Sequence, residues 1–212
     1  MELLHFIVGH IDTNCYVPYD PETGEAIVID PGGNAHEILA KLTVKRLHVH
    51  RIILTHGHFD HMLAADAIRK RTGAKIAVHR GDAELLSADP SSLYKSIMRE
   101  PYSACEPDIM LSGGEKTRIA GIEAEIIHTP GHTPGSVIIR MDNALFTGDT
   151  LFEGDCGRTD LPGGDPRQMR MSLRMIAGFE FDYLIYPGHG PATTLEFEKR
   201  NNPDLRAAAG IV

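Results

Sequence analysis

The chain has 212 residues, a formal net charge of −8 and three scattered cysteines, Cys15, Cys105 and Cys156. This length can bury a large core without disulfides, and an odd number of cysteines with no CxxC pair favours a reducing, cytoplasmic location. An acidic chain without a Lys/Arg block disfavours nucleic acid as a partner, and the lack of an apolar run of about 20 residues disfavours a membrane partner.

Strands and helices alternate along the first half of the sequence. We predict strands at residues 3–8, 14–19, 25–33 (with a terminal turn), 51–55 and 75–79, and helices at 35–47 and 62–73. Gly73 ends the second of these helices. Residues 82–101 have a helical pattern that Pro90 interrupts.

The second half repeats this theme. We predict two strands around Gly121 within 115–131, further strands at 136–141, 144–148 and 182–190, and helices at 165–179 and 194–200. Asp165 is the expected N-cap of the first of these helices, with Pro166 at its first position. No linker or repeat interrupts the pattern, so we expect a single domain over 1–212. Its fold class is α/β (α+β), with two packed sheets covered by helices in a four-layer αββα sandwich.

Histidines and aspartates cluster where predicted strands end. The stretch "HGHFDH" follows the strand "RIILT", and three further clusters lie in "TPGHTPGS", "FTGDT" and "YPGHG". Each cluster sits in a glycine-flanked turn after an apolar strand, so we expect the clusters to converge on one rim of the sheets. The residues concerned are His56, His58, Asp60, His61, His132, Asp149 and His189.

Seven such side chains are too many for one ion, which takes about four to six ligands, but suit two divalent ions that share a carboxylate. In an extended backbone, His56 and His58 point to the same side, whereas Asp60 and His61 follow a change of direction and can face a second point. Nitrogen and oxygen ligands without cysteine favour zinc, with iron and manganese as alternatives.

The remaining candidates receive structural interpretations. We expect Asp30 to stabilise a turn, Thr55 and Thr147 to hold strand ends, and Cys156 to play no nucleophilic part. Packing or surface roles are expected for the other histidines, which are His5, His10, His36, His48, His50, His79 and His128.

The HxHxDH motif with distant His, Asp and His resembles the metallo-β-lactamase superfamily. "TPGHTPGS" and "FTGDTLFEGDCGR" are similar to its glyoxalase II group, and "PGHGPATTLEFEKRNNP" is similar to short, single-domain hydrolases of that group. The resemblance implies an αββα sandwich with a dinuclear site. It implies one ion on His56, His58 and His132, a second ion on Asp60, His61 and His189, and Asp149 as the bridge.

The resemblance also implies thioester hydrolysis, with S-D-lactoylglutathione as the usual substrate and a hydroxide between the two ions as the nucleophile. The catalytic residues would be Asp60, which can assist proton transfer, and Asp149. Arg158 in "CGRTD" would bind a substrate carboxylate; its alternative role is an ion pair with Asp160 or Asp155. Only 23 residues follow His189, too few for the helical part that binds glutathione in longer enzymes, so weak discrimination among carboxylated thioesters is expected.

Two other functions stay open. The "GRTD" segment is similar to persulfide dioxygenases, which implies a single Fe(II) on His56, His132 and Asp149. A non-catalytic domain stabilised by metal is the third possibility. The sequence does not indicate an oligomeric state.

Overall fold

The structure is a computed structural model that describes residues 1–87, 104–119 and 121–211. Its first sheet has six strands in sequence order: β1 (Glu2–Val8), β2 (Thr13–Tyr19), β3 (Glu25–Ile29), β4 (His48–Ile53), β5 (Lys75–His79) and β6 (Ile109–Leu111). The strands β1 to β3 pair antiparallel, and β3 to β6 pair parallel. Parallel neighbours need crossovers, which α1 (Ala35–Lys45) and α3 (Ala65–Thr72) provide.

The second sheet has the order β14-β13-β10-β9-β8-β7. Its strands are β7 (Lys116–Ile119), β8 (Ile122–His128), β9 (Val137–Met141), β10 (Ala144–Gly148), β13 (Leu184–Pro187) and β14 (Thr193–Thr194). Only β10 and β13 pair parallel, and the crossover between them contains α5 (Pro166–Ala177). Asp165 caps α5 by accepting from the Arg167 amide at 2.7 Å, as predicted.

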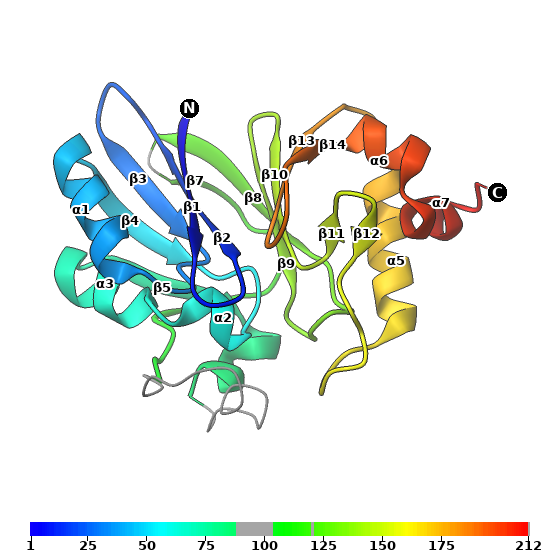
Figure 1. The fold of residues 1–212 in the computed structure, drawn as a ribbon, viewed down its shortest axis with the longest axis horizontal. Coiled ribbons are helices and arrows are strands. Elements are labelled where there is room, and N and C mark those ends of the chain that lie inside the picture. Colours follow the sequence, from blue (N-terminus) through cyan, green and yellow to red (C-terminus); the bar gives the residue numbers. More distant parts are fainter. Residues whose placement is uncertain (88–103, 120, 212) are drawn as a thin grey trace.

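Three apolar clusters hold the layers together. One lies between the sheets and includes Ile53 and Phe146. A second packs the outer face of the first sheet against α1 and α3, and a third packs the second sheet against α5 and α7 (Pro203–Ala209). Figure 1 shows the two sheets side by side with helices on both outer faces. The predicted four-layer αββα sandwich is confirmed.

Short elements are where the predictions were incomplete. The chain forms α2 (Phe59–Met62), β6, the hairpin of β11 (Leu151–Phe152) and β12 (Asp155–Cys156), and β14 without having been predicted to do so. The closing helix is α6 (Leu195–Asn201), and a further helix, α7, follows it. Of the predicted helix 82–101, residues 88–101 lie outside the described part; its start belongs to a 3-10 helix, Arg80–Leu86. Among the described helices, none has the length and apolar character needed to cross a membrane.

Candidate metal centre

The structure brings the predicted histidines and aspartates together at one rim of the sandwich. Residues 56–61 follow β4, His132 follows β8, Asp149 follows β10 and His189 follows β13. The two sheets are joined at this rim, where the Asn14 amide donates to the Gly188 carbonyl at 2.7 Å. These residues form groups of three, and within each group the ligand atoms lie within 4.8 Å of one another.

Three imidazoles converge in the first group. The His58 Nδ1 atom lies 3.1 Å from His56 Nε2 and 2.9 Å from His132 Nε2. Burial, and then the neighbouring imidazole of His132, lower the pKa of His58 to about 3. Burial followed by the nearby histidines also lowers the pKa of His56 well below its usual value. The rings of His58 and His56 are therefore neutral at pH 7, which is the form that binds metal.

The opposite nitrogens of two rings fix their tautomers. His132 Nδ1 lies 2.8 Å from the Arg158 carbonyl, which can only accept, so this nitrogen carries the hydrogen and Nε2 keeps its lone pair. The Thr55 hydroxyl donates to Asp30 at 2.6 Å and can accept from His56 Nδ1 at 3.1 Å. The Nε2 atoms of both rings thereby keep their lone pairs and point into the group, where they can bind a metal ion.

The second group consists of Asp60, His61 and His189. Asp60 Oδ2 lies 3.2 Å from the Nε2 atoms of both histidines. Thr13 donates its hydroxyl to the same oxygen at 3.2 Å. Burial opposes ionisation of Asp60, but the two histidines outweigh it and hold the pKa of its carboxyl well below the usual range. On its other side, His61 Nδ1 lies 3.0 Å from Asp30, which orients the ring.

Asp149 lies between the two groups. Its Oδ1 is 3.4 Å from His61 Nε2, and its Oδ2 is 3.5 Å from His132 Nε2 and 3.7 Å from His189 Nε2. The Asp149 carboxylate thus lies close to histidines of both groups, which is the arrangement that a bridging ligand requires. A side chain on Gly188 would come within 2.2 Å of Asp149 Oδ1, so only glycine permits this approach.

Unsatisfied polar atoms indicate that the site fits cations. His61 Nε2 and Asp149 Oδ1 are buried, and neither has a hydrogen-bond partner among the described residues. Buried polar atoms without partners are costly, and a cation between them would remove that cost. The imidazole and carboxylate donors suit divalent zinc, iron or manganese. The assignment of each ligand to one ion or the other stays a prediction.

Asp30, which was expected to stabilise a turn, supports the site through Thr55 and His61 instead. Its carboxylate accepts from the Thr55 amide at 2.7 Å and the Thr55 hydroxyl at 2.6 Å, and it orients His61. The hydroxyl of Thr147 donates to the Leu151 carbonyl at 2.8 Å and so holds the turn after β10, which agrees with the prediction.

Asp82 is a supporting residue that the sequence did not reveal. This fully buried carboxylate accepts from the amides of Gly57 and Gly135, at 2.9 and 2.7 Å, and from the Thr133 hydroxyl at 2.6 Å. It therefore ties the loop of His56 and His58 to the loop of His132. Its partners lie 25 to 53 positions away, and no local motif signals such a link.

The side chain of Arg158 is exposed and paired. Its Nε and Nη2 atoms each donate to an Asp160 oxygen at 2.7 Å, so the alternative predicted for this residue, an ion pair with Asp160, is present. The nearby thiol of Cys156 has its pKa raised to about 12 by burial and by Asp204 and Asp155. Such a thiol is not a nucleophile at neutral pH. All three cysteines are free.

The other histidines lie outside the groups of candidate ligands. His79 stacks on His128 with ring centroids 4.0 Å apart, and His5 stacks on Tyr16. His50 lies 3.3 Å from Glu25. These contacts agree with the packing and surface roles expected for them.

Known proteins are similar to this chain in sequence. The family model of the metallo-beta-lactamase superfamily matches residues 8–189. The hydroxyacylglutathione hydrolase GloC of Haemophilus influenzae is 36% identical over 92% of the chain and 93% of its own length. The probable metallo-hydrolase YqgX of Bacillus subtilis is 33% identical over 93% of the chain and 94% of its own length.

Two solved structures are also similar. The B3 metallo-beta-lactamase BLEG-1 has a TM-score of 0.90 and 34% identity, covering 96% of the chain and 99% of its own. The protein TTHA1623, solved in a di-iron-bound form, has a TM-score of 0.80 and 32% identity, covering 94% and 98%.

Proposed function

Since the chain belongs to the metallo-beta-lactamase superfamily and is a metal-dependent hydrolase, we propose that it hydrolyses thioesters of the hydroxyacylglutathione type. S-D-lactoylglutathione is the first substrate to test. The observation that carries the proposal is the pair of ligand groups joined by Asp149, and the similarity to GloC supports the substrate class.

Seven side chains would hold two divalent ions, zinc first and iron or manganese as alternatives. His56, His58 and His132 would bind one ion, Asp60, His61 and His189 the other, and Asp149 both. When bound, such ions supply an activated water for attack and polarise the carbonyl of the substrate.

The chain's own residues would position the reactants and move the proton. Asp60 is ionised because His61 and His189 depress the pKa of its carboxyl, so it can accept a proton beside the reacting carbonyl. The departing thiol has a pKa of about 8.5 and leaves as a thiolate, so no general acid is needed. This matches a site in which Asp60 is held in the ionised form.

Arg158 would bind the carboxylate of the substrate. A guanidinium presents paired N–H groups that match a carboxylate, and Arg158 already binds Asp160 in this way. The carboxylate of the substrate would therefore displace the carboxylate of Asp160 from the Arg158 guanidinium. Because both groups are exposed, this exchange carries little desolvation cost.

Steady-state hydrolysis by the metal-loaded protein tests the proposal. We expect turnover of S-D-lactoylglutathione and of smaller carboxylated thioesters, and much slower turnover of a β-lactam, whose amide nitrogen needs a proton. A β-lactam belongs in the assay because BLEG-1 is a metallo-beta-lactamase. Metal-loaded protein that leaves every thioester intact would contradict the proposal.

A persulfide dioxygenase is the second candidate. It would use one Fe(II) on His56, His132 and Asp149, and the 3.5 Å between His132 and Asp149 is compatible with this set. Oxygen consumption with glutathione persulfide would identify it. A non-catalytic metal-stabilised domain would show neither activity.

A further inference from the structure

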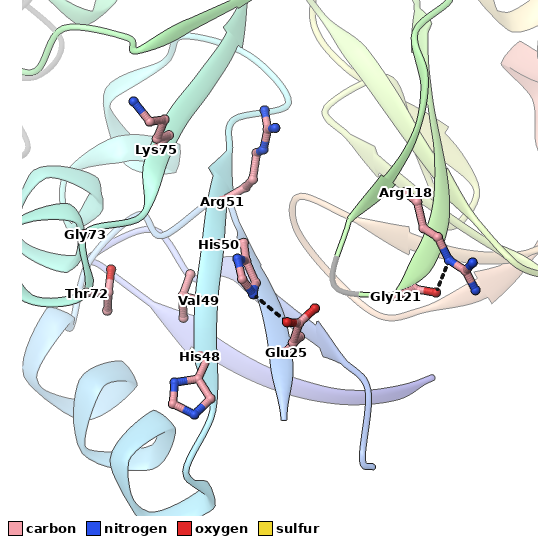
Figure 2. Close-up of a pocket in the computed structure, with 10 residues that line it drawn as sticks. All are labelled: Glu25, His48, Val49, His50, Arg51, Thr72, Gly73, Lys75, Arg118 and Gly121. Carbon is pink, nitrogen blue, oxygen red and sulfur yellow. Dashed lines mark hydrogen bonds and ion pairs between the residues drawn. The ribbon is translucent and has the colours of Figure 1, made fainter. Parts of the chain in front are cut away.

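A groove of about 710 Å³ lies at the end of the sandwich opposite the metal centre. Figure 2 shows that its lining comes from the starts of β3 and β5, from residues 48–51 of β4, from the end of α3 and, across the groove, from β7 and the turn after it. None of the seven candidate metal ligands lines the groove, and they follow the opposite ends of strands such as β4. The groove is therefore distinct from the candidate metal centre.

The charge of the groove is opposite to that of the chain as a whole. Among the residues that the structure describes, three permanent cations line it, Arg51, Lys75 and Arg118, against one acidic residue, Glu25. Glu25 Oε1 lies 3.3 Å from His50 Nε2, as Figure 2 also shows, and the three cations outnumber this one carboxylate. In a protein with a net charge of −8, this gathers uncompensated positive charge in one place.

Two of these cations are direct neighbours in the first sheet. Arg51 and Lys75 are register partners on the parallel strands β4 and β5. Two positions further along, Ile53 and Ala77 pack between the sheets, so strand alternation places both cations on this same inner face. Like charges on neighbouring strands repel each other, and Arg51 is only partly exposed to screening water.

Nothing in the described part of the chain compensates this pair. Neither the Arg51 nor the Lys75 side chain has a hydrogen-bond or ion-pair partner among the residues that the structure describes. Arg118 donates its Nε hydrogen to the Gly121 carbonyl at 2.8 Å and has no acidic partner within the same residues. A bound anion would therefore relieve the repulsion between the Arg51 and Lys75 side chains.

We propose that this groove binds a small, multiply charged oxyanion that carries phosphate or carboxylate groups. The Arg51 guanidinium offers a two-pronged contact, Lys75 adds a point charge, and Arg118 contributes from the second sheet. The volume lies within the range of small-molecule sites. The site is independent of the hydrolytic reaction proposed above.

Titration of the metal-loaded protein tests this, with inorganic phosphate as the probe and succinate as the carboxylate arm. Backbone amide NMR shifts report where each anion binds. We expect saturable shifts at Arg51 and Lys75, and at least tenfold weaker binding there in the double variant Arg51→Gln/Lys75→Gln. The control Lys41→Gln/Arg174→Gln removes the same charge outside the groove and should change the affinity less than twofold.

Thermal unfolding gives a second measurement that does not depend on the double variant. At low salt, Lys75→Gln should unfold at a higher temperature than wild type, because the repulsion is removed, and should lose the stabilisation that the bound anion gives wild type. Shifts confined to the metal centre, equal affinity in the two double variants, or binding of neither probe would overturn the proposal. The probe that binds with the higher affinity shows whether the groove prefers phosphate or carboxylate groups.

Discussion

At the scale of single residues, Asp149 is the side chain on which the proposed dinuclear centre depends. Its two oxygens face His61 and His132, which belong to different ligand groups. Asp149→Ala should therefore weaken both metal sites and lower turnover by on the order of a thousandfold or more. Metal content per chain and steady-state rates, measured on the same samples, check this. A full complement of two ions with near-normal turnover would reject the bridge.

Arg158 and Asp160 form an ion pair, and substitutions of the two residues should change KM in opposite directions. Arg158→Ala should raise KM for a carboxylated thioester and leave kcat nearly intact, because the contact is made equally in ground and transition states. Asp160→Asn should lower KM, since it removes the carboxylate that competes with the substrate. Steady-state kinetics on both variants measure this. If KM is unchanged in Arg158→Ala, the arginine has only a structural role.

The thiol of Cys156 should be inert. With a pKa of about 12, only on the order of one molecule in ten thousand is a thiolate at pH 8, compared with roughly a quarter for an ordinary thiol. We expect iodoacetamide at pH 8 to alkylate Cys156 at least about a hundredfold more slowly than it alkylates glutathione. Mass spectrometry of both reactions over time measures the two rates. Cys156→Ser should keep most of its activity. A thousandfold loss with metals still bound would point to a covalent mechanism.

At the scale of elements, the turns after the strands carry the site, and Asp82 fixes two of them to each other. Asp82→Asn replaces an acceptor with an amide that cannot satisfy both the Gly57 and Gly135 amides. We expect a loss of about 2–3 kcal/mol in the free energy of unfolding and weaker metal binding at the His56, His58 and His132 group. Urea unfolding and metal titration measure the two effects.

Asp182→Asn is the matched control, because Asp182 is exposed and accepts from the Glu196 amide at 2.9 Å, away from the metal centre. It should cost less than about 1.5 kcal/mol and leave the metal affinity unchanged. Equal losses in the two variants would show that Asp82 does not position the loops.

The elements also show what a sequence can and cannot reveal. The long strands and the HxHxDH spacing were predictable because alternation and turn chemistry are local. Asp82 was not, because its partners come from loops far along the chain. The two-residue strands β11 and β12 are too short for any pattern. The helix α7 did have a signal, since Asn202 caps it, Pro203 is its first residue and Gly210 ends it.

At the scale of the whole molecule, the site lies where the two sheets meet, with ligands from both. Residues 56–61 extend from the first sheet, and His132, Asp149 and His189 extend from the second. Bound ions would therefore cross-link the two halves of the sandwich and stabilise the folded state. Removal of metal by a chelator should lower the unfolding temperature as well as abolish turnover.

The measurement that tests the central claim most directly is a metal titration with two assays run in parallel. Metal-free protein receives zinc, iron or manganese in steps, and each sample is assayed for hydrolysis of S-D-lactoylglutathione and for oxygen consumption with glutathione persulfide. The account predicts thioester hydrolysis that rises to a maximum at two ions per chain, without oxygen consumption. Oxygen consumption that is complete at one iron per chain, with no thioester hydrolysis under any metal, would contradict it.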